Sequence, residues 1–266
     1  MHIKGKTIFF DAPPIITGHA GVAGKKEGEG PLAQDFDAIF EDTTMGQQSY
    51  ELAESAMLHD AIIRALSDAG KSPSEVNFVL SGDLLDQCMG SAFALKDLEI
   101  SSIGLYGACS TMALSLSVGS MLVDAGAKCV VAGTSSHFCS SERQFRFPLE
   151  YGGQRPPSAQ WTVTGAGSAV VEQEGEGTKV KAVQIGTITD FGITDANNMG
   201  AAMAPVNAIL RLWTTACNPS KFIMSYFRCS RIFFTSTYAS MPSAKKYAIP
   251  PKLQHSNSCL DYNPLS

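Results

Sequence analysis

The amino-acid sequence predicts an α/β fold, in which a mixed β-sheet carries helices on its faces. Helical and strand-like segments alternate along residues 47–186, and glycine and proline separate them. The strand-like runs are short and apolar, as buried strands are. The chain has 266 residues and is 44% hydrophobic, which is enough for a substantial buried core.

The first strongly periodic segment covers residues 47–69. Apolar residues recur there at helical spacing, and Gly70 follows as a C-cap. Turn-forming residues at 71–75 lead into a strand predicted at 76–80, which ends shortly before Asp83. A further helix is expected to begin directly after Asp83.

The alternation of strand and helix continues beyond that point. The next helical segment is apolar almost all round, which is typical of a helix buried by its neighbours. A proline-rich loop at 148–157 then separates two groups of strands. The predicted elements are a helix at 110–125 and strands at 103–106, 129–132, 163–171 and 180–186.

Three polar side chains are predicted to follow successive strand ends: Asp83, Cys109 and His137. In sheets of this kind, ligands gather at the carboxyl ends of the strands. Cys109 stands between a strand and a helix, where the positive end of the helix dipole favours a thiolate or a bound anion. Each residue also has a structural interpretation. Asp83 can be a helix cap, Cys109 a small buried hydrophobe and His137 a hydrogen-bonded histidine. The residues alone leave both interpretations open.

Charge and cysteine content exclude several classes of protein. The formal net charge is −5 without a basic cluster, which argues against nucleic-acid binding. The seven cysteines show no zinc-like spacing, so we expect free thiols in a reducing cytoplasm. No secretory signal or membrane-spanning run is predicted. The glycine-rich segment 24–31 lacks the ending of a phosphate loop and is predicted to be a flexible loop.

The chain changes character after Pro205. Residues 1–205 carry all 24 glycines and 24 of the 25 acidic residues, with a net charge of −11. Residues 206–266 carry no glycine and a net charge of +6, although a segment of this length ordinarily holds roughly four glycines. Two strand-like runs within it are interrupted by arginines. We therefore predict an α/β unit at 1–205 and a poorly organised tail at 206–266, and we hypothesise a shifted reading frame.

Several motifs, in order along the chain, resemble the stage V sporulation protein AD family of the thiolase-like fold. They lie at residues 10–16, 36–46, 65–70 with Pro73 and Val76, 107–111, 130–137, 146–152 and 161–167. The resemblance covers about residues 1–205 and implies the amino-terminal half of a thiolase-like α/β fold. The tail does not match the second half that the family would lead us to expect.

The resemblance implies a non-catalytic component of a spore membrane complex. Such a protein binds dipicolinic acid, with or without calcium, and supports its uptake into the forespore, with a link to spore germination. It would be made in the cytoplasm and lie peripherally at the spore inner membrane, beside the membrane proteins of the complex. No cofactor and no nucleic-acid partner is implied, and a homodimer is left open.

The matching positions suggest a ligand site formed by Asp83, Gln87, Cys109 and His137. Backbone N–H groups at the helix start near Cys109 would receive one carboxylate of dipicolinate. His137 would donate a hydrogen bond to another oxygen, and Asp83 would face the calcium of a chelated ligand. Gln87, one helical turn beyond Asp83, would add a neutral amide contact.

Two alternative functions are also open. The first is an acyltransferase of the condensing-enzyme class, in which Cys109 becomes acylated. Enzymes of that class pair this cysteine with histidine or asparagine from the second half of the fold, so catalysis is not expected here. The second is a truncated product without function, because half of a two-half fold would expose an apolar face.

Overall fold

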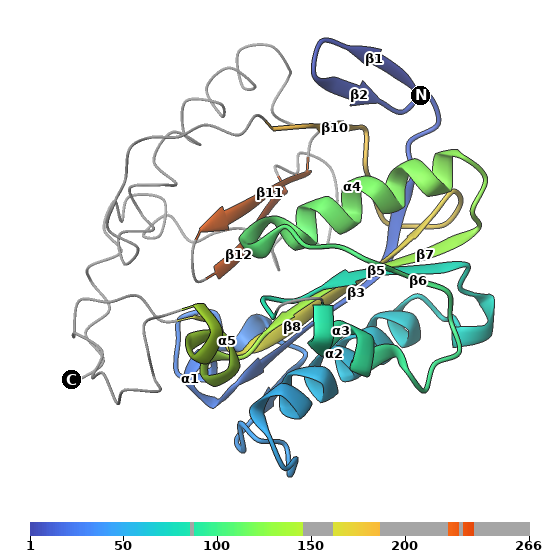
Figure 1. The fold of residues 1–266 in the computed structure, drawn as a ribbon. Coiled ribbons are helices and arrows are strands. Elements are labelled where there is room, and N and C mark those ends of the chain that lie inside the picture. The colour runs from blue at the N-terminus through green and yellow to red at the C-terminus, as the bar shows by residue number, and fades with distance from the viewer. Residues whose placement is uncertain (86–87, 146–161, 187–222, 229–230, 237–266) are drawn as a thin grey trace. The chain divides into compact units, whose positions relative to one another are not determined.

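The computed structural model describes residues 1–85, 88–145, 162–186, 223–228 and 231–236. The chain divides into two units, of which the first comprises Met1–Gly152 and Thr162–Gly186. The predicted α/β class is confirmed in this unit, where a mixed seven-stranded sheet carries helices on both faces (Figure 1). No helix within the described residues is both long and apolar enough to cross a membrane.

The central sheet has the strand order β4-β3-β8-β7-β5-β6, and β9 pairs with β3. Strand β5 lies parallel to both of its neighbours, β6 and β7, whereas β8 is antiparallel to β3 and β7. The strands are β3 (Ile15–Gly24), β4 (Ala38–Phe40), β5 (Phe78–Gly82), β6 (Ser102–Gly104), β7 (Cys129–Ser136), β8 (Gly165–Glu172) and β9 (Thr178–Lys179). A separate small antiparallel sheet contains β1 (His2–Lys4), β2 (Thr7–Phe9) and β10 (Ala182–Gln184).

Helices cover both faces of the central sheet. Helices α2 and α3 lie on one face and α4 on the other (Figure 1). The helices are α1 (Lys25–Gly28), α2 (Tyr50–Asp68), α3 (Met89–Leu95), α4 (Thr111–Asp124) and α5 (Phe138–Phe145). Short 3₁₀ turns are η1 (Ala33–Asp35), η2 (Pro73–Glu75) and η4 (Ala108–Ser110).

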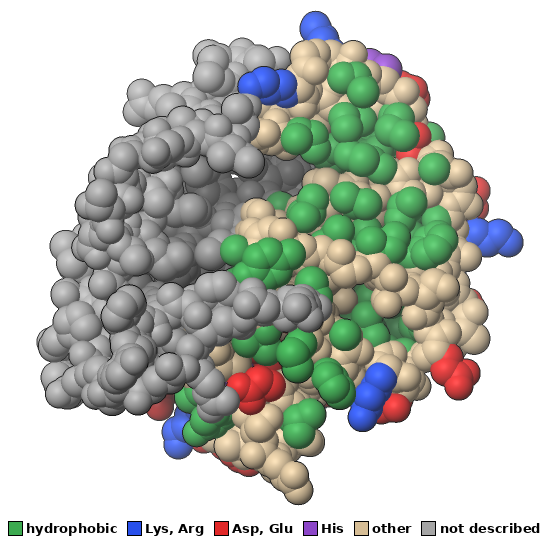
Figure 2. All heavy atoms as spheres, viewed as in Figure 1, with side chains coloured by type: hydrophobic (Ala, Val, Ile, Leu, Met, Phe, Trp, Pro, Cys, Tyr) green, Lys and Arg blue, Asp and Glu red, His purple; other side chains and the backbone are tan. Residues whose placement is uncertain are grey.

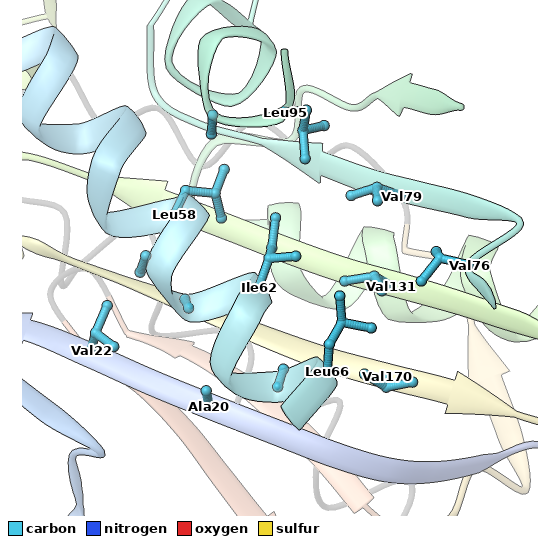
Figure 3. Close-up of a cluster of buried hydrophobic side chains, with 14 of the residues drawn as sticks. Ala20, Val22, Leu58, Ile62, Leu66, Val76, Val79, Leu95, Val131 and Val170 are labelled. Atoms are coloured by element: carbon cyan, nitrogen blue, oxygen red, sulfur yellow. The ribbon is translucent and has the colours of Figure 1, made fainter. Parts of the chain in front are cut away.

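Helix α2 confirms the prediction of a helix within 47–69. The Ser49 side chain caps it by accepting a hydrogen bond from the backbone N–H of Leu52 at 3.2 Å. Gly70, with φ of +66°, lets the chain leave the helix in the left-handed region. The buried face of α2 packs against the sheet, as Figure 3 shows for Leu58, Ile62 and Leu66, together with Val22, Val131 and Val170 from the strands.

Several sequence-based expectations were wrong in detail. The helix expected directly after Asp83 begins at Met89, because the Asp83 side chain accepts the N–H of Leu85 and the chain bends at residues 84–85. Residues 25–28 of the glycine-rich segment form the short helix α1 instead of a flexible loop. Helix α4 is buried along one face only, and its other residues are partly exposed among the described residues. The proline-rich loop at 148–157 lies outside the described residues.

The described part of the second unit is a β-hairpin. Strands β11 (Ile223–Arg228) and β12 (Arg231–Ser236) pair antiparallel, with Arg228 opposite Arg231. The arginines that seemed to interrupt the strand-like runs therefore lie at the ends of the two strands. The boundary at Pro205 and the shifted reading frame stay predictions.

Large apolar side chains are exposed around β6, which is an edge strand of the central sheet. Ile103 belongs to β6, Tyr106 to the segment after it, and Met89 and Phe93 to α3. Figure 2 shows hydrophobic side chains spread over the described part of the surface in this view. The apolar edge thus includes the strand that leads toward Cys109.

The packing of α2 gives a direct stability test. Ile62 is fully buried, whereas its neighbour Ile63 is 37% exposed. We expect Ile62→Ala to lower the free energy of unfolding by about 2–5 kcal/mol, because it leaves a cavity between helix and sheet. Ile63→Ala, the matched control, should change it by about 0.5 kcal/mol or less. Equal losses in urea unfolding of the two variants would contradict this packing.

Candidate functional site

The carboxyl ends of three parallel strands meet at one edge of the central sheet. Strands β6, β5 and β7 are adjacent and run in the same direction. Asp83 directly follows β5, His137 directly follows β7, and the segment from β6 leads into the turn that holds Cys109. The predicted convergence of these strand ends is therefore confirmed, independently of whether they bind a ligand.

The turn after β6 is fixed by its close approach to β5. The backbone N–H of Leu105 donates to the Ser81 carbonyl at 2.8 Å. A Cβ atom at Gly82 would lie only 1.8 Å from the carbonyl oxygen of Leu105, so a larger residue cannot stand there without displacing the turn. From the other side, the Thr134 hydroxyl donates to the Gly82 carbonyl at 3.1 Å. These contacts hold β7, β5 and the turn together.

Cys109 occupies the middle of η4, immediately before the 14-residue helix α4. Ala108 has φ of +45°, a strained conformation for a residue with a side chain. The Ser110 hydroxyl donates back to the Gly107 carbonyl at 2.6 Å, and the Thr111 hydroxyl donates to the Ala108 carbonyl at 2.8 Å. Because the Ser110 side chain points back in this way, it does not cap the first turn of α4.

Asp83 is buried and holds two backbone segments. Its Oδ1 accepts a hydrogen bond from the N–H of Leu85 at 2.8 Å, and its Oδ2 accepts one from the N–H of Ser91 at 2.6 Å. Ser91 belongs to α3, so the carboxylate ties this helix to the end of β5. The structural interpretation of Asp83 is thus present, although the helix it holds starts later than predicted. Gln87 lies outside the described residues.

His137 is also buried, and both nitrogens of its ring are engaged. Nε2 donates to the Thr43 carbonyl at 2.9 Å, and Nδ1 accepts from the N–H of Cys139 at 3.1 Å. The ring stacks on Tyr50 with centroids 5.1 Å apart. An acceptor Nδ1 requires the neutral ring, and burial lowers the pKa of the imidazole below its ordinary value. A hydrogen bond from His137 to a ligand would therefore require the loss of one of these contacts.

Sequence reasoning missed a third buried polar residue, Glu54 on α2, which is fully buried. Its carboxyl group contacts the hydroxyls of Ser135 at 3.2 Å and Ser140 at 2.7 Å. Burial raises the pKa of Glu54 to about 8, and the nearby charge of Asp83 adds to the shift. The signal in the sequence was an acid four residues before Leu58, on the apolar face of a predicted helix.

The described residues also form a hollow away from these strand ends. A shallow hollow lies at the opposite edge of the sheet, at the amino ends of β5 and β6, and contains none of the predicted site residues. Its lining is Pro73, Ser74, Val76, Asn77, Leu98, Glu99, Ile100 and Ser101. Within the described residues, no group of three or more His, Cys, Asp or Glu side chains is placed to hold a metal ion.

Fold and site together define an α/β protein with a strained strand–turn–helix elbow beside two buried polar residues. The chain belongs to the stage V sporulation protein AD family, whose model matches residues 4–215. Stage V sporulation protein AD of Bacillus subtilis is 40% identical over 210 residues, which cover 78% of this chain and 62% of the relative. The chain therefore spans less than two thirds of the length of this relative.

Similar solved structures include synthases of acyl chains. A priming β-ketosynthase from a polyketide pathway is 17% identical, with a TM-score of 0.41, over 67% of this chain and 54% of its own. The 3-oxoacyl-[acyl-carrier-protein] synthase III of Aquifex aeolicus is 16% identical, with a TM-score of 0.41, over 61% of this chain and 55% of its own. No activity is carried over to this chain from these likenesses.

The contact between β5 and the elbow can be tested with two glycine substitutions. Gly82→Ala should lower the free energy of unfolding by about 1–3 kcal/mol or more, because the new methyl group overlaps the Leu105 carbonyl. At Gly21 in β3, a new Cβ would lie 3.9 Å from its nearest neighbour, so Gly21→Ala serves as the control and should cost far less. Similar unfolding midpoints in guanidinium for the two variants would argue against this tight approach.

The buried state of Glu54 predicts a pH dependence of stability. Since its folded pKa of about 8 lies above the ordinary value of 4.5, the folded chain binds an extra proton between these values and loses stability as pH rises through them. Relative to the wild type, Glu54→Gln should gain up to about 1.4 kcal/mol per pH unit across this window. The exposed Glu99→Gln variant serves as the matched control. A difference between Glu54→Gln and wild type that stays constant from pH 5 to 8 would contradict the burial of an ionisable group.

Proposed function

We propose that this chain is a non-catalytic binding protein for dipicolinic acid, taken alone or as its calcium chelate. On this proposal it supports dipicolinate uptake into the forespore, at the spore inner membrane, with the membrane proteins of the same complex as partners. Membership of the stage V sporulation protein AD family supports the role in sporulation. The binding proposal depends on one observation, the amino end of α4 at Cys109.

The chemistry of this helix end suits an anionic ligand. The first N–H groups of a helix lack partners within it, and the helix dipole makes this end positive. In α4 the Ser110 hydroxyl turns back to the Gly107 carbonyl and leaves the first turn uncapped by its side chain. The N–H groups of Ser110 and Thr111 already donate to the Gly107 and Ala108 carbonyls, so a carboxylate of dipicolinate would accept from the N–H groups that follow in the first turn of α4.

Asp83 and His137 are proposed to shape the pocket through the segments that they fix. Asp83 holds the start of α3, and His137 holds the turn between β7 and α5 to the Thr43 backbone. Asp83 follows β5, the neighbour of β6 in the sheet, and His137 follows β7, which lies on the other side of β5. Gln87, between Asp83 and α3, stays a proposed direct contact to the ligand.

The strained elbow also favours a second candidate, an acyltransferase that uses Cys109. A helix amino terminus stabilises a thiolate, and strained backbone is common at catalytic turns. Within the described residues, however, both nitrogens of the neighbouring His137 are already engaged, so this histidine is poorly placed to act as a base. Incubation with acyl-coenzyme A followed by mass spectrometry separates the two functions, since only the acyltransferase gains an acyl mass that Cys109→Ala abolishes.

Calorimetric titration with dipicolinate tests the binding proposal. Ser110→Asp places a carboxylate where the ligand would bind, and acidic caps stabilise helices, so the variant should fold. We expect its affinity to fall at least about tenfold, which corresponds to about 1.4 kcal/mol of charge repulsion. Ser110→Asn introduces a cap of the same shape without the charge, so it should lose less affinity than Ser110→Asp. Equal affinities of the Asp and Asn variants would remove the α4 terminus from the site.

A further inference from the structure

Glu54 is a buried acid that pairs with no cation among the described residues. It is fully buried on α2, and it forms no salt bridge to any described residue. The ionisable groups that act on it or adjoin it are Glu51 on its own helix, Asp83 after β5 and His137 before α5. Two of these groups are acidic and His137 is neutral, so no described group would compensate the charge of an ionised Glu54.

The hydrogen bonds around Ser140 have room for a proton on Glu54. The Ser140 oxygen lies 2.7 Å from Oε2 of Glu54 and 3.1 Å from the carbonyl oxygen of His137. A serine hydroxyl carries one hydrogen and cannot donate to both acceptors at once. If Glu54 is protonated, its hydroxyl donates to Ser140, Ser140 donates to the His137 carbonyl, and Ser135 donates to Oε1. Every polar group in the cluster is then satisfied.

We propose that Glu54 is a positioning residue of the anion site: it holds a proton and, through Ser140, fixes the turn that joins β7 to α5. This inference rests on the proposed function, because it concerns the same pocket. The turn carries His137, whose carbonyl also accepts the N–H of Ser141 and whose ring accepts the N–H of Cys139. Glu54 thus acts on the site through Ser140 and the turn, without touching the ligand.

The proton has a second consequence for an anionic ligand. A neutral Glu54 adds no negative charge next to Asp83. Ionisation of Glu54 would add a negative charge there and would turn the Ser140 hydroxyl away from the His137 carbonyl. Both effects weaken anion binding, so the site should lose affinity in alkaline solution.

The expected loss of affinity follows from the fraction of Glu54 that is protonated. With a pKa of about 8, Glu54 is about 90% protonated at pH 7 and about 10% protonated at pH 9. If the protonated form alone is competent, the apparent affinity falls about tenfold across this range. The carboxylates of dipicolinate stay ionised throughout, so the ligand itself contributes no such change.

Two readouts on the full chain test the proposal, and the first needs no ligand. Amide hydrogen exchange at Cys139 and Ser141, corrected for intrinsic rates, should speed up about tenfold in the wild type between pH 7 and 9. Glu54→Gln mimics the protonated carboxyl group and should change less than twofold. Ser140→Ala breaks the link to His137, so exchange there should be fast at both pH values. Glu99→Gln should behave like the wild type.

The second readout is the affinity for dipicolinate at the same two pH values. We expect about a tenfold loss in the wild type and less than a twofold change in Glu54→Gln. The proposal is overturned if amide exchange changes equally with pH in the wild type and in Glu54→Gln. It is also overturned if exchange in the wild type changes with pH while its affinity for dipicolinate stays the same. If dipicolinate binds at neither pH, the proposed function fails, and the exchange data still decide whether Glu54 positions the turn.

Discussion

The close approach of the Gly82 backbone to the Leu105 carbonyl is the contact on which the candidate site depends. It seats the segment after β6 on the end of β5, while Thr134 joins β5 to β7 from the other side. Parallel pairing alone would bring three strand ends to one edge of the sheet. The glycine contact also fixes the elbow that directs the chain into α4. The positive end of this helix therefore starts close to the end of β5.

The parts of the fold that could be predicted are those with a local signal. Helix α2 has a regular apolar period and clear caps, and β5 is a compact apolar run between turns. Strand β3 was missed because Gly18, Gly21 and Gly24 break its apolar pattern. The structure explains Gly18, since a Cβ there would lie 2.5 Å from the Ala65 carbonyl of α2. The residue that hides the strand in the sequence is the one that lets the helix pack closely.

The candidate site could likewise be predicted only in part. The positions of Asp83, Cys109 and His137 after strand ends followed from the order of elements. Their partners did not, because they come from distant parts of the chain. Thr43 is 94 residues from His137, and the two serines that contact Glu54 are 81 and 86 residues away from it. Long-range hydrogen bonds of this kind depend on sheet order and helix placement, which local patterns do not specify.

Amide chemical shifts of the full chain, followed during titration with dipicolinate, test most directly whether the amino end of α4 receives the ligand. The backbone N–H of Met112, in the first turn of α4, should shift in a saturable manner, as a donor to a carboxylate does. The N–H groups of Ser110 and Thr111 should move less, because they already donate to the carbonyls of Gly107 and Ala108. The neighbouring amides of Leu85 and Cys139 should move less, because their acceptors belong to the protein. Saturable shifts confined to the hollow around Ser74 and Ser101, with none at the start of α4, would contradict an anion site at the elbow.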